Sequence, residues 1–161
     1  MNKQGLIPAL ISITALSIII ISILWFILER TRVIGPILIT LGLIAWIPIR
    51  ISGRAIRSAG ADIIFGIIDT GLLGVAALIG ARYGGILGAV VGGAVGDAIT
   101  DGFAGVFEGK VAEFLRKHGI DEARTPMSAS MGKLSGCLIG VGITLTIAWS
   151  ILNINVDLLA V

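Results

Sequence analysis

The stretch from Gly84 to Asp101, "GGILGAVVGGAVGDAITD", repeats glycine at every fourth position and ends in two aspartates. Residues four apart lie on one face of an α-helix. A face of small residues lets two helix backbones approach closely, which favours association between helices in a membrane. The stretch therefore predicts a membrane helix that packs tightly on a neighbour. The glycines of this face are Gly84, Gly88, Gly92 and Gly96.

The composition of the whole chain also indicates a membrane protein. Its 161 residues are 56% hydrophobic and 14% charged, and the mean hydropathy is +1.04. A soluble domain has roughly 25% charged residues. The net charge is only +2, and no basic run is long enough to form a nucleic-acid groove. We expect one integral membrane domain, residues 1–161, in contact with the lipid bilayer and with no nucleic acid.

A helix that crosses a bilayer needs about 20 mainly apolar residues, and five segments qualify. They are residues 6–28, 33–49, 60–81, 84–107 and 126–152. A short amphipathic helix at the membrane surface is predicted over residues 109–118. Thr125 and Pro126 are typical of an N-cap and a first helical residue. The predicted fold is all-α, a compact bundle of about five transmembrane helices with glycine-zipper packing.

The distribution of basic residues predicts the orientation. With five crossings, the side of the N-terminus holds nine of the 12 Lys and Arg residues. Basic residues are enriched on the cytoplasmic side of membrane proteins, so we expect a cytoplasmic N-terminus and an external C-terminus. The first apolar segment is longer than the core of a signal peptide, which has about 7–15 residues. Short loops and the lack of a targeting segment favour the plasma membrane of a prokaryote.

Cysteine and histidine are scarce, which limits the chemistry. The chain has one cysteine, Cys137, and one histidine, His118. A disulfide framework and a Cys-type zinc site are therefore excluded within one chain. Any chemistry must come from carboxylates, hydroxyls, Arg or Lys.

A second glycine face lies in the last segment, at Gly132, Gly136 and Gly140. The same spacing and the same packing argument apply there. The partner of either glycine face is a helix of the same chain or of another copy. Because a chain this small has a limited core, we expect a homo-oligomer or a subunit of a larger membrane complex.

The acidic residues of the third and fourth segments are predicted to form a column. At ~1.5 Å per helical residue, Asp69 and Asp97 fall at the same level, near the middle of an apolar core of about 30 Å. Asp62, Asp101 and Glu108 lead from there toward the cytoplasm. An ionised Asp at the membrane centre costs on the order of 2.5–3.5 kcal/mol on insertion scales. Such residues are therefore protonated, paired, or next to water or a cation.

We interpret this column as a route for a cation or a proton. Asp69 and Asp97 would be the binding or relay groups, Asp62, Asp101 and Glu108 the cytoplasmic approach, and Thr70 and Thr100 would lie beside them. No cofactor motif is present, although the acids could hold a bound cation, with Asp69, Asp97 and Asp101 as candidate ligands. In a first alternative, the chain is a non-catalytic accessory or scaffold subunit, and the acids hold helices together.

The second alternative is an intramembrane enzyme, which two partial resemblances suggest. "GAVGDAITD", residues 93–101, resembles the second half of the CDP-alcohol phosphotransferase signature, whose aspartates hold metal ions. The first half of that signature is absent here, because Gly74 and Ala77 occupy its aspartate positions. "AVGD", residues 94–97, is similar to the Gly-x-Gly-Asp motif of intramembrane aspartyl proteases, with the first glycine replaced. In that reading Asp69 would be the second aspartate.

Overall fold

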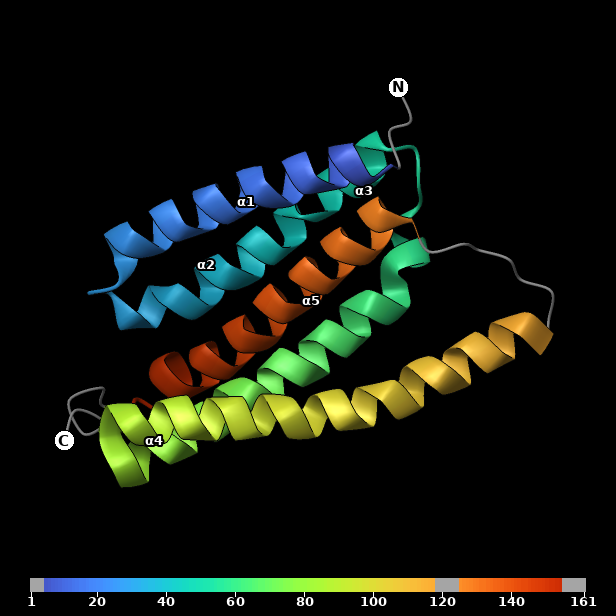
Figure 1. The fold of residues 1–161 in the computed structure, drawn as a ribbon. Helices are drawn as coiled ribbons and strands as arrows, with labels where there is room; N and C mark the ends of the chain where they lie inside the picture. The colour runs from blue at the N-terminus through green and yellow to red at the C-terminus, as the bar shows by residue number, and fades with distance from the viewer. Residues whose placement is uncertain (1–4, 118–124, 155–161) are drawn as a thin grey trace.

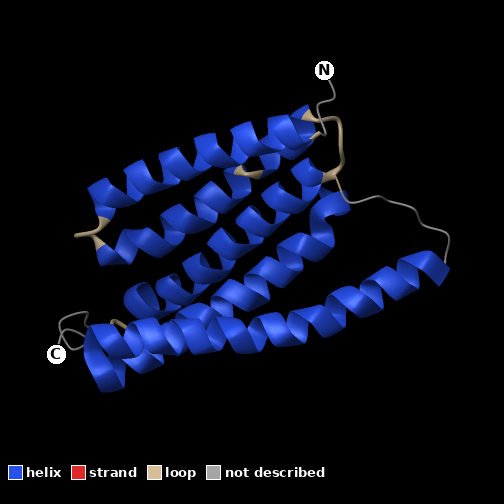
Figure 2. Cartoon of the chain, viewed as in Figure 1, coloured by secondary structure: helices blue, strands red, loops and turns tan. Residues whose placement is uncertain are grey.

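A computed structural model describes residues 5–117 and 125–154, and in these residues every regular element is a helix (Figure 2). The elements are α1 (Leu6–Ile27), α2 (Thr31–Ile44), α3 (Trp46–Ile51), η1 (Ile56–Ala59), α4 (Gly60–Lys117), α5 (Pro126–Leu145) and η2 (Thr146–Ile151). The prediction of an all-helical chain is confirmed for this part of the sequence. The Thr125 side chain caps α5 by accepting a hydrogen bond from the Ser128 backbone N–H, as predicted.

Four helical stretches among the described residues are long and apolar enough to cross a membrane. They are Leu6–Ile27, Thr31–Ile51, Ile56–Ala104 and Pro126–Ile151. Large apolar side chains, such as Phe26, Ile86 and Phe103, are exposed on the outside of the bundle. An apolar exterior is what a membrane protein presents to lipid. The structure is therefore compatible with a membrane protein that has transmembrane helices.

The helix α4 reverses direction at two glycines. Gly84 and Gly85 have non-helical backbone angles, and Gly85 adopts a positive φ of 55° with ψ of −139°. Glycine reaches this region without steric cost because it has no Cβ atom. In Figure 1 the chain runs along the bundle in green, turns sharply and returns in yellow. We call residues 60–83 the first arm of α4 and residues 86–117 its second arm.

The two arms touch backbone to backbone where their residues are small. The Gly80 and Gly88 backbones are so close that a Cβ atom on either would collide with the carbonyl oxygen of the other. One turn further, a Cβ atom on Gly92 would lie 2.5 Å from the Ala76 carbonyl oxygen. The second-arm glycines thus pack on the first arm of the same helix.

The helix α5 lies in the middle of the bundle and contacts α1, α2, α3 and α4 (Figure 1). Its Gly136 and Gly140 lie against the first arm of α4, where a Cβ atom would meet the carbonyl oxygens of Ile63 and Ile67. Gly132 lies beside Asp62, because its Cβ atom would be 3.0 Å from the Asp62 Cβ atom. All three glycines therefore belong to a close helix contact within the chain.

The opposite side of α5 packs on α2 and α3. A Cβ atom on Gly42 of α2 would lie 2.9 Å from the Ser135 carbonyl oxygen. The indole Nε1–H of Trp46 donates a hydrogen bond of 2.7 Å to the fully buried Ser135 hydroxyl. Trp46 therefore joins α3 to α5 inside the bundle.

Two sequence expectations differ from the structure in detail. Gly84 has no atom within 4 Å of a hypothetical Cβ, so it serves the reversal and not a packing face. The segment 109–118, expected as a separate surface helix, is helical to Lys117 without a break from the second arm, and residue 118 lies outside the described part. The apolar and charged pattern of this segment indicated a helix, but Gly109 at its start does not end the preceding helix, which continues to Lys117.

The contact between the arms predicts that a larger side chain in the contact lowers the stability of the protein. A Gly92→Ala change should force the arms apart, since overpacking costs about 1–3 kcal/mol. Thermal unfolding in detergent, followed by circular dichroism, should show a lower midpoint than for the unmodified chain. The matched control is Gly102→Ala on the same arm, where no atom lies within 4 Å and alanine favours the helix by up to about 1 kcal/mol. Equal midpoints for the two variants would contradict this packing.

Candidate functional site

The candidate site is a buried carboxylate between the arms of α4. The Asp69 side chain comes from the first arm and is only 4% exposed. Its Oδ1 atom accepts a hydrogen bond of 2.5 Å from the Thr100 hydroxyl of the second arm. Among the described residues, no Lys or Arg forms a salt bridge with Asp69. The carboxylate is thus held by a neutral hydroxyl at the place where the two arms meet.

The small residues of the arms place Thr100 opposite Asp69. Going from the reversal, Gly80 faces Gly88 and Ala76 faces Gly92. The next level brings Leu73 next to Gly96, and the level after that joins Asp69 to Thr100. Each level advances about four residues along each arm, which is one helical turn. The close approach near the reversal therefore fixes the partner of Asp69.

The Thr100 hydroxyl has more acceptors around it than it has protons. It lies 3.1 Å from the Gly96 carbonyl oxygen and 3.0 Å from the Asp97 carbonyl oxygen, besides the contact with Asp69. A threonine hydroxyl has one proton to donate and two lone pairs that accept. It can donate to an ionised Asp69, or it can donate to a carbonyl of its own helix and accept the proton of a neutral Asp69. The Thr100 hydroxyl thus has alternative acceptors within its own helix besides the Asp69 carboxyl group.

The α5 helix adds a thiol to this region. The Cys137 thiol lies close to the Thr70 hydroxyl of the first arm, in the neighbourhood of Asp69, Asp97 and Lys133. A Cβ atom on Gly66 would lie 2.8 Å from the Cys137 backbone nitrogen. The glycine contact between α4 and α5 therefore brings Cys137 next to the polar residues of the first arm.

The other predicted acids lie in different surroundings. Asp62 is buried, Asp97 is half-buried and Asp101 is exposed. The sequence predicts Asp69 and Asp97 at the same level in the membrane. In the structure Asp69 pairs with Thr100 instead. Asp97 therefore lies three residues, or about 4.5 Å along the helix, from the level of Asp69. The Glu108 side chain lies outside the described residues. In the described part of the chain, no three His, Cys, Asp or Glu residues are grouped as a metal site.

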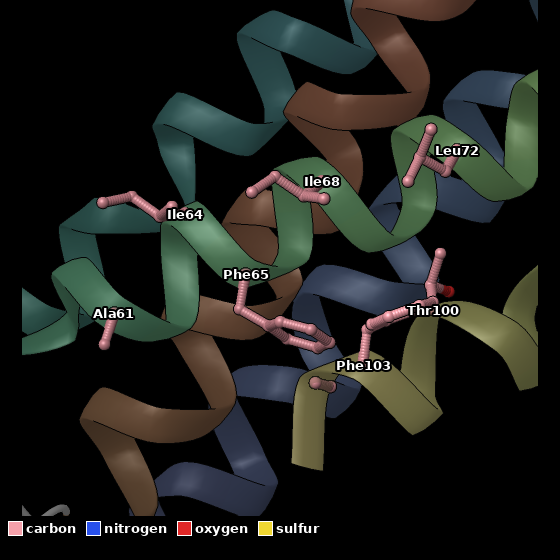
Figure 3. A pocket seen from close by; sticks show the side chains of 8 residues that line it. Ala61, Ile64, Phe65, Ile68, Leu72, Thr100 and Phe103 are labelled. Carbon is pink, nitrogen blue, oxygen red and sulfur yellow. The ribbon is translucent and has the colours of Figure 1, made fainter. Parts of the chain in front are cut away.

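An apolar groove of about 600 Å³ opens on the outside of the two arms (Figure 3). Phe65 of the first arm and Phe103 of the second arm project into it, and Thr100 is its polar lining residue. The remaining lining residues are Ala61, Ile64, Ile68, Leu72 and Ala104. The Thr100 side chain thus lies between the groove and the buried Asp69.

The sequence predicts Asp69 and Thr100 as site residues, but it does not predict a role for Cys137, the groove or the Trp46–Ser135 bond. A signal for Cys137 was present, because it lies four residues after Lys133 and next to Gly136 of the predicted packing face. The groove has no such signal, since its lining comes from two helix faces that each resemble any lipid-facing surface.

Comparison of the chain with protein-family models, with curated proteins and with solved structures finds no match.

The Asp69–Thr100 hydrogen bond predicts that replacing Thr100 lowers stability more than replacing Thr40 does. Thr100→Val keeps the shape of the side chain but removes the donor to a buried carboxylate, which costs about 1–3 kcal/mol. Thr40→Val is the matched control, because the Thr40 hydroxyl is exposed and bonds only the Pro36 carbonyl of its own helix. We expect a lower unfolding midpoint for Thr100→Val alone, and Thr100→Ser should restore it. Indistinguishable midpoints for the two valine variants would rule out this bond as a stabilising contact.

Proposed function

We propose that this chain is a five-span membrane protein that moves a proton or a small cation, with Asp69 as the binding group. The span count follows if each arm of α4 crosses the bilayer separately. At ~1.5 Å per residue, residues 60–83 extend ~36 Å and residues 86–117 extend ~48 Å. Both lengths exceed an apolar core of about 30 Å. The small-residue contacts between the arms, and between α4 and α5, then form a glycine zipper inside the membrane.

The proposed orientation puts the N-terminus in the cytoplasm and the C-terminus outside, in the plasma membrane of a prokaryote. Two observations support opposite sides for the two ends. The start of α1 and the end of η2 lie at opposite ends of the bundle (Figure 1). Arg50, Arg54 and Arg57 lie in or next to α3 and η1, at the end of the bundle where α1 starts, and basic residues are enriched on the cytoplasmic side.

Labelling with a membrane-impermeant maleimide tests this topology in intact cells. In a Cys137→Ser background, Tyr83→Cys should react from outside, and Arg57→Cys should react only after the cells are opened. Both positions are exposed, so burial does not explain a difference. Reaction of both variants from the same side would refute the five-span arrangement.

The single observation that supports transport best is the buried Asp69–Thr100 pair. A charged group in the membrane interior is costly, and acids at such positions commonly mark ion pathways and proton relays. The hydroxyl beside Asp69 can complete a hydrogen bond with the ionised carboxylate or with the neutral acid. A carboxyl group that is stable in both states can accept a proton or cation from one side and release it to the other.

The neighbouring polar groups define the proposed route by which a proton or cation reaches Asp69. Asp62 lies seven residues earlier, on the same face of the first arm and toward η1. On the other arm, Asp97 and Asp101 flank Thr100, and Asp101 is exposed. In the proposal, Asp62, Asp101 and Glu108 form the cytoplasmic approach, whereas Asp97 and Thr70 lie around the central site. A bound cation would replace the proton at Asp69 in a cation-moving protein.

A proton or cation flux assay in proteoliposomes tests the role of Asp69. Asp69→Asn keeps the size of the side chain but holds no exchangeable charge, so the flux should fall to the level of protein-free vesicles. Glu29→Gln is the control, since this exposed acid lies between α1 and α2, outside the proposed route, and its flux should stay near that of the unmodified protein. The transport proposal fails if the unmodified protein moves neither protons nor common cations, or if Asp69→Asn is fully active.

An accessory subunit is the second candidate, and the large apolar exterior favours it. Exposed Val90, Val95 and Phe103 line the outside of the second arm, and such surfaces suit contact with lipid or with another membrane protein. This candidate predicts that Val95→Trp, which alters the exposed outer face of the second arm, abolishes assembly of a complex in pull-down experiments, whereas Asp69→Asn leaves the complex intact. A homo-oligomer would meet the same test with differently tagged copies.

A further inference from the structure

The groove between the arms of α4 has the depth of one bilayer leaflet. It begins at Ala61, next to the start of the first arm, and ends at Leu72. At ~1.5 Å per residue these positions are ~16 Å apart. Half of an apolar core of about 30 Å is about 15 Å. Beyond Leu72 the arms close on each other, because Gly96 lies against Leu73 and Ala76.

This depth distinguishes between two possible occupants. A transmembrane helix of a second copy would need a surface that continues across the whole bilayer, whereas this groove ends near the midplane. An acyl chain belongs to one leaflet and ends near the midplane. The apolar lining and the volume of about 600 Å³ fall in the range of sites for small molecules, about 300–1,000 Å³.

A lysine lies next to one of the residues that line the groove. The Lys133 ammonium of α5 is 5.2 Å from the centre of the Phe65 ring, which is itself part of the groove lining. The long lysine stem can swing the ammonium toward the membrane surface. The headgroup of a lipid whose chain enters at Ala61 would meet this positive charge.

We propose that the groove binds one acyl chain of an anionic phospholipid from the leaflet at the Lys133 end, with the phosphate near Lys133. This inference rests on the proposed membrane crossing of both arms, but it does not depend on transport. The chain would lie between Phe65 and Phe103 and extend to Thr100. It would thereby cover the outer side of the Asp69–Thr100 pair with hydrocarbon and keep lipid-side water away from it.

Native mass spectrometry of the full chain, released from detergent after incubation with defined lipids, tests the proposal. The probes are phosphatidylglycerol and phosphatidylcholine with identical acyl chains. We expect one phosphatidylglycerol per chain to be retained preferentially. Lys133→Gln should lower this preference about fivefold, since a basic residue near the surface contributes about 1 kcal/mol. Lys110→Gln, an exposed lysine away from the groove lining, should leave it unchanged.

A bulky residue in the groove tests whether lipid is retained at this site or over the apolar surface in general. Ile68→Trp should abolish retention of either lipid, because Ile68 lines the groove and is 54% exposed, so tryptophan can occupy the groove. Ile79→Trp is the matched control, because Ile79 is 55% exposed on the same arm and outside the groove lining. If Ile68→Trp retains lipid as the unmodified chain does, the site is refuted. Equal retention of both lipids by the unmodified chain overturns the headgroup assignment.

A cross-linking measurement examines the competing occupant. In a Cys137→Ser background in native membranes, Ile68→Cys should give no more disulfide-linked dimer than Ile79→Cys does. A dimer formed efficiently from Ile68→Cys alone would show that a second copy covers the groove, and would overturn the lipid proposal. Because these readouts involve no flux, their failure is distinguishable from a failure of the transport proposal.

Discussion

The close contact between the two arms of α4 is the constraint on which the rest of the structure depends. Gly84 and Gly85 allow the chain to reverse, and the Gly80–Gly88 contact brings the two backbones together directly after the turn. Larger side chains at these positions would separate the arms. Once the first contact is set, the helical repeat determines every later pair, down to Asp69 and Thr100.

The second glycine contact, between α4 and α5, completes the surroundings of Asp69. It places Gly136 on the backbone of the first arm and Cys137 next to Thr70. The Thr144 hydroxyl donates a hydrogen bond of 3.0 Å to the Gly71 carbonyl oxygen, which adds a polar contact between the same helices. The acid is therefore enclosed by packing that uses backbone and small residues, and the larger apolar side chains are left to face outward.

Much of this arrangement could be predicted from the sequence, because it depends on spacing within one helix. The four-residue glycine repeats indicated close packing, and the depth of the acidic residues indicated that Asp69 lies level with Asp97, with Thr100 beside them. The exact partner of Asp69 could not be predicted, since it depends on which residues form the reversal. The sequence also left open the partner of each glycine face, because a face of glycine fits any close helix, whether from the same chain or another.

The most direct measurement of the central claim is disulfide formation across the arms in the membrane. In a Cys137→Ser background, the pair Asp69→Cys with Thr100→Cys should form a bond within one chain, since the two side chains contact each other across the arms and disulfides form only between neighbouring residues. The pair Asp69→Cys with Asp97→Cys should form it poorly. Efficient bonding of the Asp97→Cys pair with none for Thr100→Cys, or bonds formed only between chains, would contradict the arrangement of the arms.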